Sequence, residues 1–173
     1  MLLLLDYLFV GLLLYNGQQR DGAGDFVSFG LLNGIPEFRF DVGSGPAVIR
    51  GDRPIEIGQW STVKLSRDRT EGTMIVNDEG PFFGSIKGSF QGLNLIEPLY
   101  VGGVPNFSTI HRLVGQTKGF TGCIGELVIG GKKQQLLRDS QTSRGVSTCD
   151  TCTHSTACKN GGVCQEGLTK KGR

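Results

Sequence analysis

Cysteine is the residue type whose spacing in this sequence points most directly to a chemistry. Four of the five cysteines lie in the last quarter of the chain, and one lies upstream of them. Their positions are Cys123, Cys149, Cys152, Cys158 and Cys164. Such crowding is most simply explained by disulfide formation in an oxidising compartment.

The alternative for the same cysteines is a zinc site. Cys149 and Cys152 have the spacing of a zinc-binding pair, and two more cysteines follow them. Five residues separate Cys158 from Cys164, however, whereas zinc sites usually place two to four between the members of a pair. The spacing therefore favours disulfides over zinc.

Residues for catalysis or for nucleic-acid binding are not recognisable. The two histidines, His111 and His154, lie near no nucleophile, metal motif or pair of opposed carboxylates. The formal net charge of +2 is small, and no cluster of Lys and Arg alternates with aromatic residues as single-strand binding requires. The sequence predicts a binding or structural protein that is not an enzyme and has no nucleic-acid partner.

Two short motifs indicate possible surface chemistry. Asn106 begins an N-x-S sequon for N-glycosylation, which has meaning only in the secretory pathway. Arg50, Gly51 and Asp52 spell an integrin-recognition tripeptide, although a turn alone accounts for Gly and Asp at these positions.

The elements that must position these residues read as short strands. Glycine occurs 28 times in 173 residues, which implies many tight turns, and no segment has the 3.6-residue period of a long amphipathic helix. Residues 26–29 and 37–42 alternate, and Asn33-Gly34 between them predicts a type I′ hairpin. Other runs of strand character are 59–66, with Trp60, Thr62 and Lys64 on one face, and 73–76, 99–105 and 119–131. The pattern predicts an antiparallel sandwich or jelly roll.

The first 15 residues, MLLLLDYLFVGLLLY, are strongly apolar. They lack a basic n-region and a small-residue cleavage site, and Asp6 interrupts them. They are also shorter than the roughly 20 apolar residues of a membrane span. We therefore expect no membrane span, and a signal anchor is the alternative.

Residues 90–131 carry a family resemblance. The segments GLNL (92–95), LYVGGVP (99–105) and FTGCIGEL (120–127) resemble the C-terminal half of a laminin G-like domain, most of all those of the perlecan and agrin type. GLLLYNGQ (11–18) is similar to an early strand of the same domain. The resemblance covers residues 11–149, and 1–10 form an atypical apolar segment where the first strands of the family should stand. Residues 152–164 resemble the first half of an EGF-like module, followed by a tail at 165–173.

The resemblance implies a fold and a disulfide pattern. The fold is an all-β antiparallel sandwich of the jelly-roll, concanavalin-like kind, with its N-terminal strands apparently missing and a short EGF-like tail. The family pairing implies that Cys123 pairs with Cys149 and that Cys152 pairs with Cys164. Cys158 would then lack its family partner.

The resemblance also implies a calcium site. Asp25 and Asn94 match positions where the family has ligating side chains, and Val42 and Gly92 match positions that supply backbone carbonyls. Calcium is a hard cation that takes such oxygen ligands. One formal negative charge among four ligands predicts weak binding. The alternative is that Asp25 and Asn94 are ordinary turn residues.

The predicted function is a secreted adhesion module of the extracellular matrix or basement membrane. The implied partners are anionic glycans of the dystroglycan type, heparan sulfate and matrix proteins, bound with calcium, and the Arg-Gly-Asp tripeptide adds integrins. One alternative is a structural spacer of a matrix proteoglycan with no ligand of its own, and another is a carbohydrate-processing enzyme. Glycan binding that disappears on chelation separates the first two.

Overall fold

The computed structural model describes residues 1–6 and 10–146. The chain divides into two compact units, Met1–Gln134 and Gln135–Arg173. In the described part of the second unit, the Asp139 amide donates to the carbonyl of Gln135, and the Gln135 amide donates to Asp139 Oδ2 at 2.8 Å. The first unit holds all the strands listed below.

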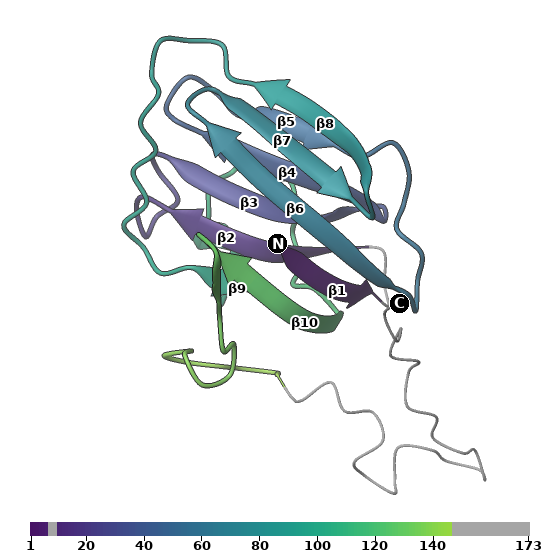
Figure 1. The fold of residues 1–173 in the computed structure, drawn as a ribbon. Coiled ribbons are helices and arrows are strands. Elements are labelled where there is room, and N and C mark those ends of the chain that lie inside the picture. Colours follow the sequence, from purple (N-terminus) through teal and green to yellow (C-terminus); the bar gives the residue numbers. More distant parts are fainter. Residues whose placement is uncertain (7–9, 147–173) are drawn as a thin grey trace, which may run out of the picture. The chain divides into compact units, whose positions relative to one another are not determined.

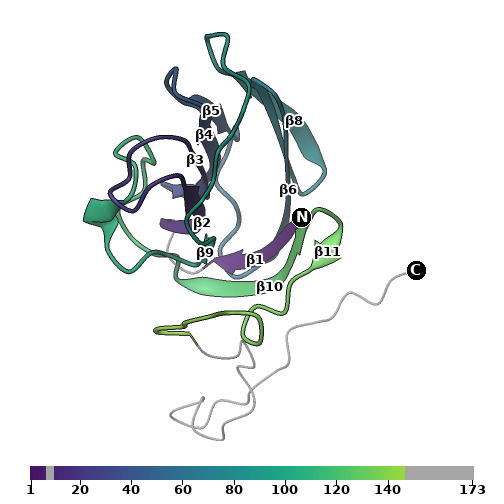
Figure 2. The same cartoon turned by 90° about the vertical axis from the view of Figure 1, so that its left-hand side faces the viewer.

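Two antiparallel sheets form the first unit (Figure 1). One has the strand order β11-β10-β1-β6-β7-β8 and the other β5-β4-β3-β2-β9. Figure 2 shows them as two layers that face each other. The predicted all-β sandwich is thus confirmed. The elements are β1 (Leu2–Asp6), β2 (Gly11–Gly17), β3 (Phe26–Leu32), β4 (Ile35–Asp41), β5 (Ala47–Arg50), β6 (Trp60–Asp68), β7 (Glu71–Val76), β8 (Glu79–Ser85), β9 (Tyr100–Val101), the 3₁₀ turn η1 (Phe107–Thr109), β10 (Gly122–Ile129) and β11 (Lys132–Lys133).

The hairpin between β3 and β4 has the predicted turn. Leu32 pairs with Ile35, and Asn33 and Gly34 have φ of 55° and 77°, as a type I′ turn requires. The turn after β7 consists of Asn77 and Asp78, both with positive φ, so Glu79 pairs with Val76 and begins β8.

Part of the apolar N-terminus, Leu2–Asp6, forms the central strand β1, at the place in the chain where the resemblance puts the first strands of the family. β1 lies between β6 and β10, pairing with both. The side chains of Leu2 and Leu4 are 2% and 0% exposed. Leu2 and Leu4 are two residues apart, so they point to the same face of β1, and both are buried in the core. No helix in the described part of the chain has the length and apolar character to cross a membrane.

Alternation along the strands divides the side chains between a core and an outer layer. Phe38 and Phe40 on β4 face the six-stranded sheet. A Cβ added there to Gly72 would lie only 2.5 Å from Phe40 Cε1. On the opposite face of β3, Phe26 belongs to a cluster with Leu12, Tyr15 and Val114. The segment that contains Val114 and η1 therefore covers the outer face of the five-stranded sheet (Figure 2).

A candidate calcium site at the sandwich rim

Three of the four predicted calcium ligands lie at one end of the five-stranded sheet. Asp25 directly precedes β3, and Val42 directly follows β4. Phe26 pairs with Asp41, so the next step of the antiparallel pair brings Asp25 beside Val42. Asn94 lies in the segment between β8 and β9.

Asp25 and Asn94 are 69 residues apart in the sequence and touch in the structure. The backbone amide of Asn94 donates to Asp25 Oδ2 at 2.8 Å, and Asn94 Nδ2 approaches the same oxygen at 3.3 Å. The structure therefore joins the two side chains that the sequence selected.

Gln18 holds the backbone of Asp25 in place. Its side-chain Oε1 accepts from the Asp25 amide at 3.0 Å, and its own amide donates to the Asp25 carbonyl at 2.8 Å. This clamp needs glycine at position 24, because φ there is +83° and an added Cβ would lie 2.0 Å from Gln18 Oε1. Asp25 consequently reaches the rim in one fixed orientation.

The segment that carries Asn94 is fastened to the end of β2. The amides of Ile96 and Glu97 both donate to the carbonyl of Gly17, at 3.2 and 3.0 Å. The side-chain amide of Asn16 donates to the Glu97 carbonyl. Asn94 is thus held against Asp25 by neighbouring backbone bonds as well as by its own.

The Val42 position is shaped by Asp41. Asp41 is 5% exposed, and its Oδ1 accepts from the amides of Gly43 and Gly45 at 2.7 and 3.1 Å. These bonds fix the turn that follows Val42. Gly92 is exposed two residues before Asn94, and no contact among the described residues joins it to the other three positions.

The electrostatics of Asp25 suit a cation. Its residue is 7% exposed, and within the described ranges no Lys, Arg or His forms an ion pair with it. Both hydrogen bonds from Asn94 reach Oδ2. A largely buried carboxylate without a counter-charge is unfavourable, and a bound cation would relieve it.

The donor set fits calcium in its chemistry. A carboxylate, a carboxamide and backbone carbonyls are all hard oxygen donors. Coordination would require the Asn94 amide to turn its oxygen, rather than Nδ2, toward the ion. Among the described residues no three His, Cys, Asp or Glu side chains cluster as a metal site, but the predicted set contains only one such side chain.

Sequence reasoning missed two residues that build this rim, Gln18 and Asp41. Asp41 had a recognisable signal, since Asp followed two positions later by Gly is typical of an Asx turn. Gln18 had no such signal, because its role depends on a hydrogen bond across the β2–β3 connection.

The remaining predicted site residues lie elsewhere. Asn106 caps η1, is exposed, and accepts from Ser108 N and Oγ through Oδ1 at 2.9 and 2.8 Å. Arg50 ends β5, and its Nε lies 3.4 Å from the buried Glu37 carboxylate, while the Gly51 amide donates to the Pro36 carbonyl at 2.9 Å. The integrin hypothesis stays a prediction, with the arginine engaged within the chain and Asp52 exposed.

Of the cysteines in the predicted disulfides, only Cys123 lies among the described residues. Cys123 lies on β10 and is 8% exposed. Cys149, Cys152, Cys158 and Cys164, and with them the EGF-like module, lie outside the described residues. The pairing therefore stays a prediction.

His111 lies in the outer layer next to the rim. Its ring stacks on Phe26, with the ring centres 4.4 Å apart, and its Nδ1 accepts from the Leu113 amide at 3.2 Å. Burial lowers the pKa of His111 below its usual 6.5, an effect that the Asp41 charge partly offsets. The stacked imidazole is a packing element here.

An antiparallel two-sheet sandwich defines the structural class. Residues 9–135 match the family described as Laminin G domain. The chain therefore belongs to the laminin G domain family.

The relatives agree with this assignment. The chain is 46% identical over 162 residues to the mouse basement membrane-specific heparan sulfate proteoglycan core protein, covering 90% of this chain and 4% of that protein. It is 35% identical over 160 residues to bovine pikachurin, covering 89% of this chain and 16% of that protein. For mouse neurexin-2 the identity is 33% over 167 residues, which is 89% of this chain and 9% of that protein.

Two solved structures share the fold. Domains LG4-5 of the mouse laminin α1 chain superpose with a TM-score of 0.68 at 26% identity, over 76% of this chain and 35% of that one. The LG1-3 region of the laminin α2 chain gives 0.62 at 22% identity, over 77% of this chain and 27% of that one. The second comparison shows the fold alone.

The chain spans a small part of each curated relative, at most 16% of those named above. What the family establishes is an extracellular binding or adhesion module of the kind found in matrix proteins, and not an enzyme.

Proposed function

We propose that this laminin G domain binds calcium weakly at the rim and, through it, an anionic glycan of the extracellular matrix or cell surface. One observation carries the proposal. Asp25 is a largely buried carboxylate that is joined to Asn94 and has no cationic side chain as partner in the described part of the chain.

The roles of the residues follow from their positions. Asp25 would contribute the negative charge, the Asn94 carboxamide an oxygen, and Val42 and Gly92 their carbonyls. Gln18 and the Gly24 turn orient Asp25 before any ligand arrives. A bound calcium ion supplies a positive centre with coordination positions left for water or sugar oxygens.

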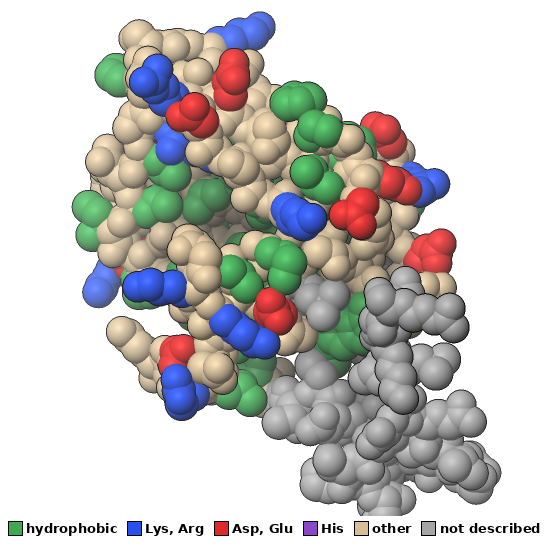
Figure 3. Space-filling model, in the orientation of Figure 1, with side chains coloured by type: hydrophobic (Ala, Val, Ile, Leu, Met, Phe, Trp, Pro, Cys, Tyr) green, Lys and Arg blue, Asp and Glu red, His purple; other side chains and the backbone are tan. Residues whose placement is uncertain are grey.

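The charge distribution favours this ion-dependent route over a purely basic surface. The face seen in Figure 3 carries Lys and Arg interspersed with Asp and Glu rather than gathered into one patch. The formal net charge is only +2. The chain's net charge therefore contributes little to its affinity for a polyanionic glycan. Attraction between the glycan and a calcium ion bound at the rim matters more.

The partner class is proposed from the relatives. The mouse relative is named as a heparan sulfate proteoglycan core protein of basement membranes. Dystroglycan-type glycans, heparan sulfate chains and matrix proteins are accordingly the partners to be tested first.

A glycan array probed with calcium and again with chelator tests the proposal. Binding that needs calcium and disappears with Asp25→Asn supports it. Asp68→Asn is the matched control, because Asp68 is exposed at the end of β6 and no ion pair joins it to another described residue. If the domain binds calcium but no glycan, the ion has a structural role only. If it binds neither calcium nor glycan, the spacer alternative is favoured.

A further inference from the structure

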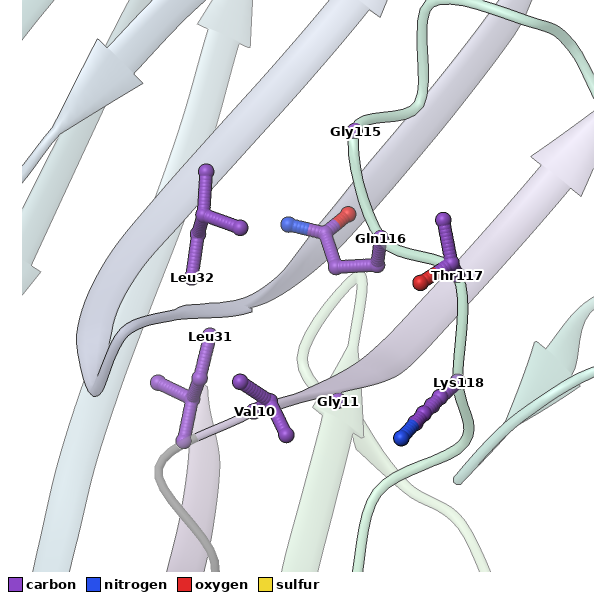
Figure 4. Close-up of a pocket in the computed structure, with 8 residues that line it drawn as sticks. All are labelled: Val10, Gly11, Leu31, Leu32, Gly115, Gln116, Thr117 and Lys118. Carbon is purple, nitrogen blue, oxygen red and sulfur yellow. The ribbon is translucent and has the colours of Figure 1, made fainter.

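A pocket lies at the opposite end of the strands that form the rim. Its walls include Val10 before β2, Leu31 and Leu32 at the end of β3, and the segment 115–118 (Figure 4). Its volume is about 150 Å³. The rim is at the Gly17 end of β2, whereas this pocket is at the Gly11 end, so about 20 Å of strand separates them.

Gln116 is the unusual residue of this pocket. It is 6% exposed, and neither its side-chain nitrogen nor its side-chain oxygen has a hydrogen-bond partner among the described residues. Figure 4 shows its carboxamide extending across β3 toward Leu32. Buried polar groups are nearly always paired, because an unpaired donor or acceptor destabilises the fold. Both Gln116 groups are buried as well as unpaired, so a small rotation of the side chain toward the pocket is needed before a ligand can supply a donor and an acceptor.

The fold holds Gln116 in this position. A Cβ added to Gly30, beneath it on β3, would lie 2.8 Å from Gln116 Cδ and 2.6 Å from the Gly11 carbonyl oxygen. The Leu12 amide donates to the Lys118 carbonyl at 2.9 Å, which fastens the segment to β2. The glutamine thus lies in a cradle that a larger residue at position 30 would fill.

The other polar groups of the lining favour an anion. Lys118 and Thr117 are exposed at the mouth, and Figure 4 shows the Lys118 ammonium turned toward the side of Val10. Among the described residues, no carboxylate lines the pocket and no acidic side chain forms an ion pair with Lys118. The remaining walls, from Val10, Leu31 and Leu32, are aliphatic.

We propose that this pocket binds an acylated amino acid with a free carboxylate and a small aliphatic side chain. The carboxylate meets Lys118, the adjoining amide exchanges hydrogen bonds with Gln116, and the aliphatic group contacts Val10 and Leu32. This chemistry is shared by a free N-acyl amino acid and by the C-terminal residue of a polypeptide. Ordered water alone is the competing occupant, since a water needs only about 10–15 Å³ of such a volume.

The test titrates the ¹⁵N-labelled domain with N-acetylvaline and follows its amide resonances. We expect shifts at residues 30–32 and 115–118 and a dissociation constant on the order of 1 mM, as a ligand of this size allows. N-acetylvalinamide, which lacks the carboxylate, should bind more weakly. A peptide ending in valine, with its C-terminally amidated form as control, distinguishes the two sources. Chelator should change nothing, which separates this pocket from the rim.

Three variants sharpen the test. Gln116→Leu should weaken binding at least about tenfold and, because it removes unpaired polar groups, raise Tm by about 2–4 °C. Lys118→Met should weaken binding by up to about fivefold. Lys132→Met, on the exposed strand β11, is the matched control and should bind as the parent does.

Three outcomes would overturn the proposal. They are the absence of shifts in the pocket with both N-acetylvaline and the valine-ending peptide, equal affinity for the acid and amide forms, and parental affinity in the Gln116→Leu variant. The first would leave water as the occupant. The Tm measurement keeps the Gln116→Leu result interpretable, since a stable variant that fails to bind has lost a contact and not its fold.

Discussion

Replacing Asn94 by Asp should tighten calcium binding and lower the stability of the calcium-free protein. The site has one formal negative charge, and extracellular modules with few charged ligands bind calcium at about 10⁻⁴ to 10⁻³ M. A second carboxylate at position 94 strengthens attraction for a divalent ion, so we expect binding to tighten about tenfold.

The effect on the calcium-free state follows from the distance between the two side chains. Asn94 Nδ2 lies 3.3 Å from Asp25 Oδ2. Two unit charges at that separation repel by about 1.3 kcal/mol in water and about 5 kcal/mol at an effective dielectric constant of 20. Residue 94 is exposed, so the lower value applies, and Tm without calcium should fall by about 2–4 °C.

Calorimetry gives the affinities, and thermal unfolding with calcium and with chelator gives the stabilities. The calcium-induced rise in Tm should be larger for Asn94→Asp than for the parent, because the ion relieves the repulsion. Asp25→Ala should abolish binding, and Asp25→Asn should abolish it while keeping an acceptor for the Asn94 amide. Sub-micromolar binding by the parent, or parental affinity in Asp25→Ala, would show that the site is elsewhere.

Three further predictions concern the rim and its surroundings. Burial lowers the pKa of His111 below 6.5, so at low pH the unfolded chain binds a proton at this imidazole more readily than the folded chain does. The contribution of His111 to the free energy of unfolding should therefore be fully present above about pH 6.5 and decrease as the pH drops below that value. Chemical denaturation of the His111→Gln variant should lack this part of the pH dependence. Asn106 should carry an N-linked glycan after secretion, detected by mass spectrometry as a mass lost with Ser108→Ala, and an unmodified site in the secreted parent would contradict it. Gly24→Ala should destabilise the chain by more than the roughly 1–2 kcal/mol of a left-handed residue, whereas Gly43→Ala, with φ of +98° but no atom near its Cβ, should cost only that amount; equal costs by denaturant unfolding would refute the steric argument.

Local pattern was sufficient for much of the fold. The alternation of residues 26–29 and 37–42 follows from the two-residue period of a strand, which adjacent residues alone determine. The Asn33-Gly34 turn depends on the backbone preferences of two residues, and the structure has it as predicted. The segments that resemble laminin G domains carried the family and, with it, the choice of Asp25 and Asn94.

Tertiary structure decided what depends on contacts between distant parts of the chain. The apolar segment Leu2–Asp6 has no periodicity that separates a strand from an anchor, and its place between β6 and β10 comes from pairing with residues some 60 and 120 positions away. Whether a described Lys, Arg or His pairs with Asp25 is likewise invisible in the sequence, because it depends on which side chains the other loops bring near. Gln116 reads as an ordinary loop residue until Gly30 and Gly11 lie beneath it. Burial and the pairing of polar groups are properties of the packed chain, so only the packed chain could show the pocket.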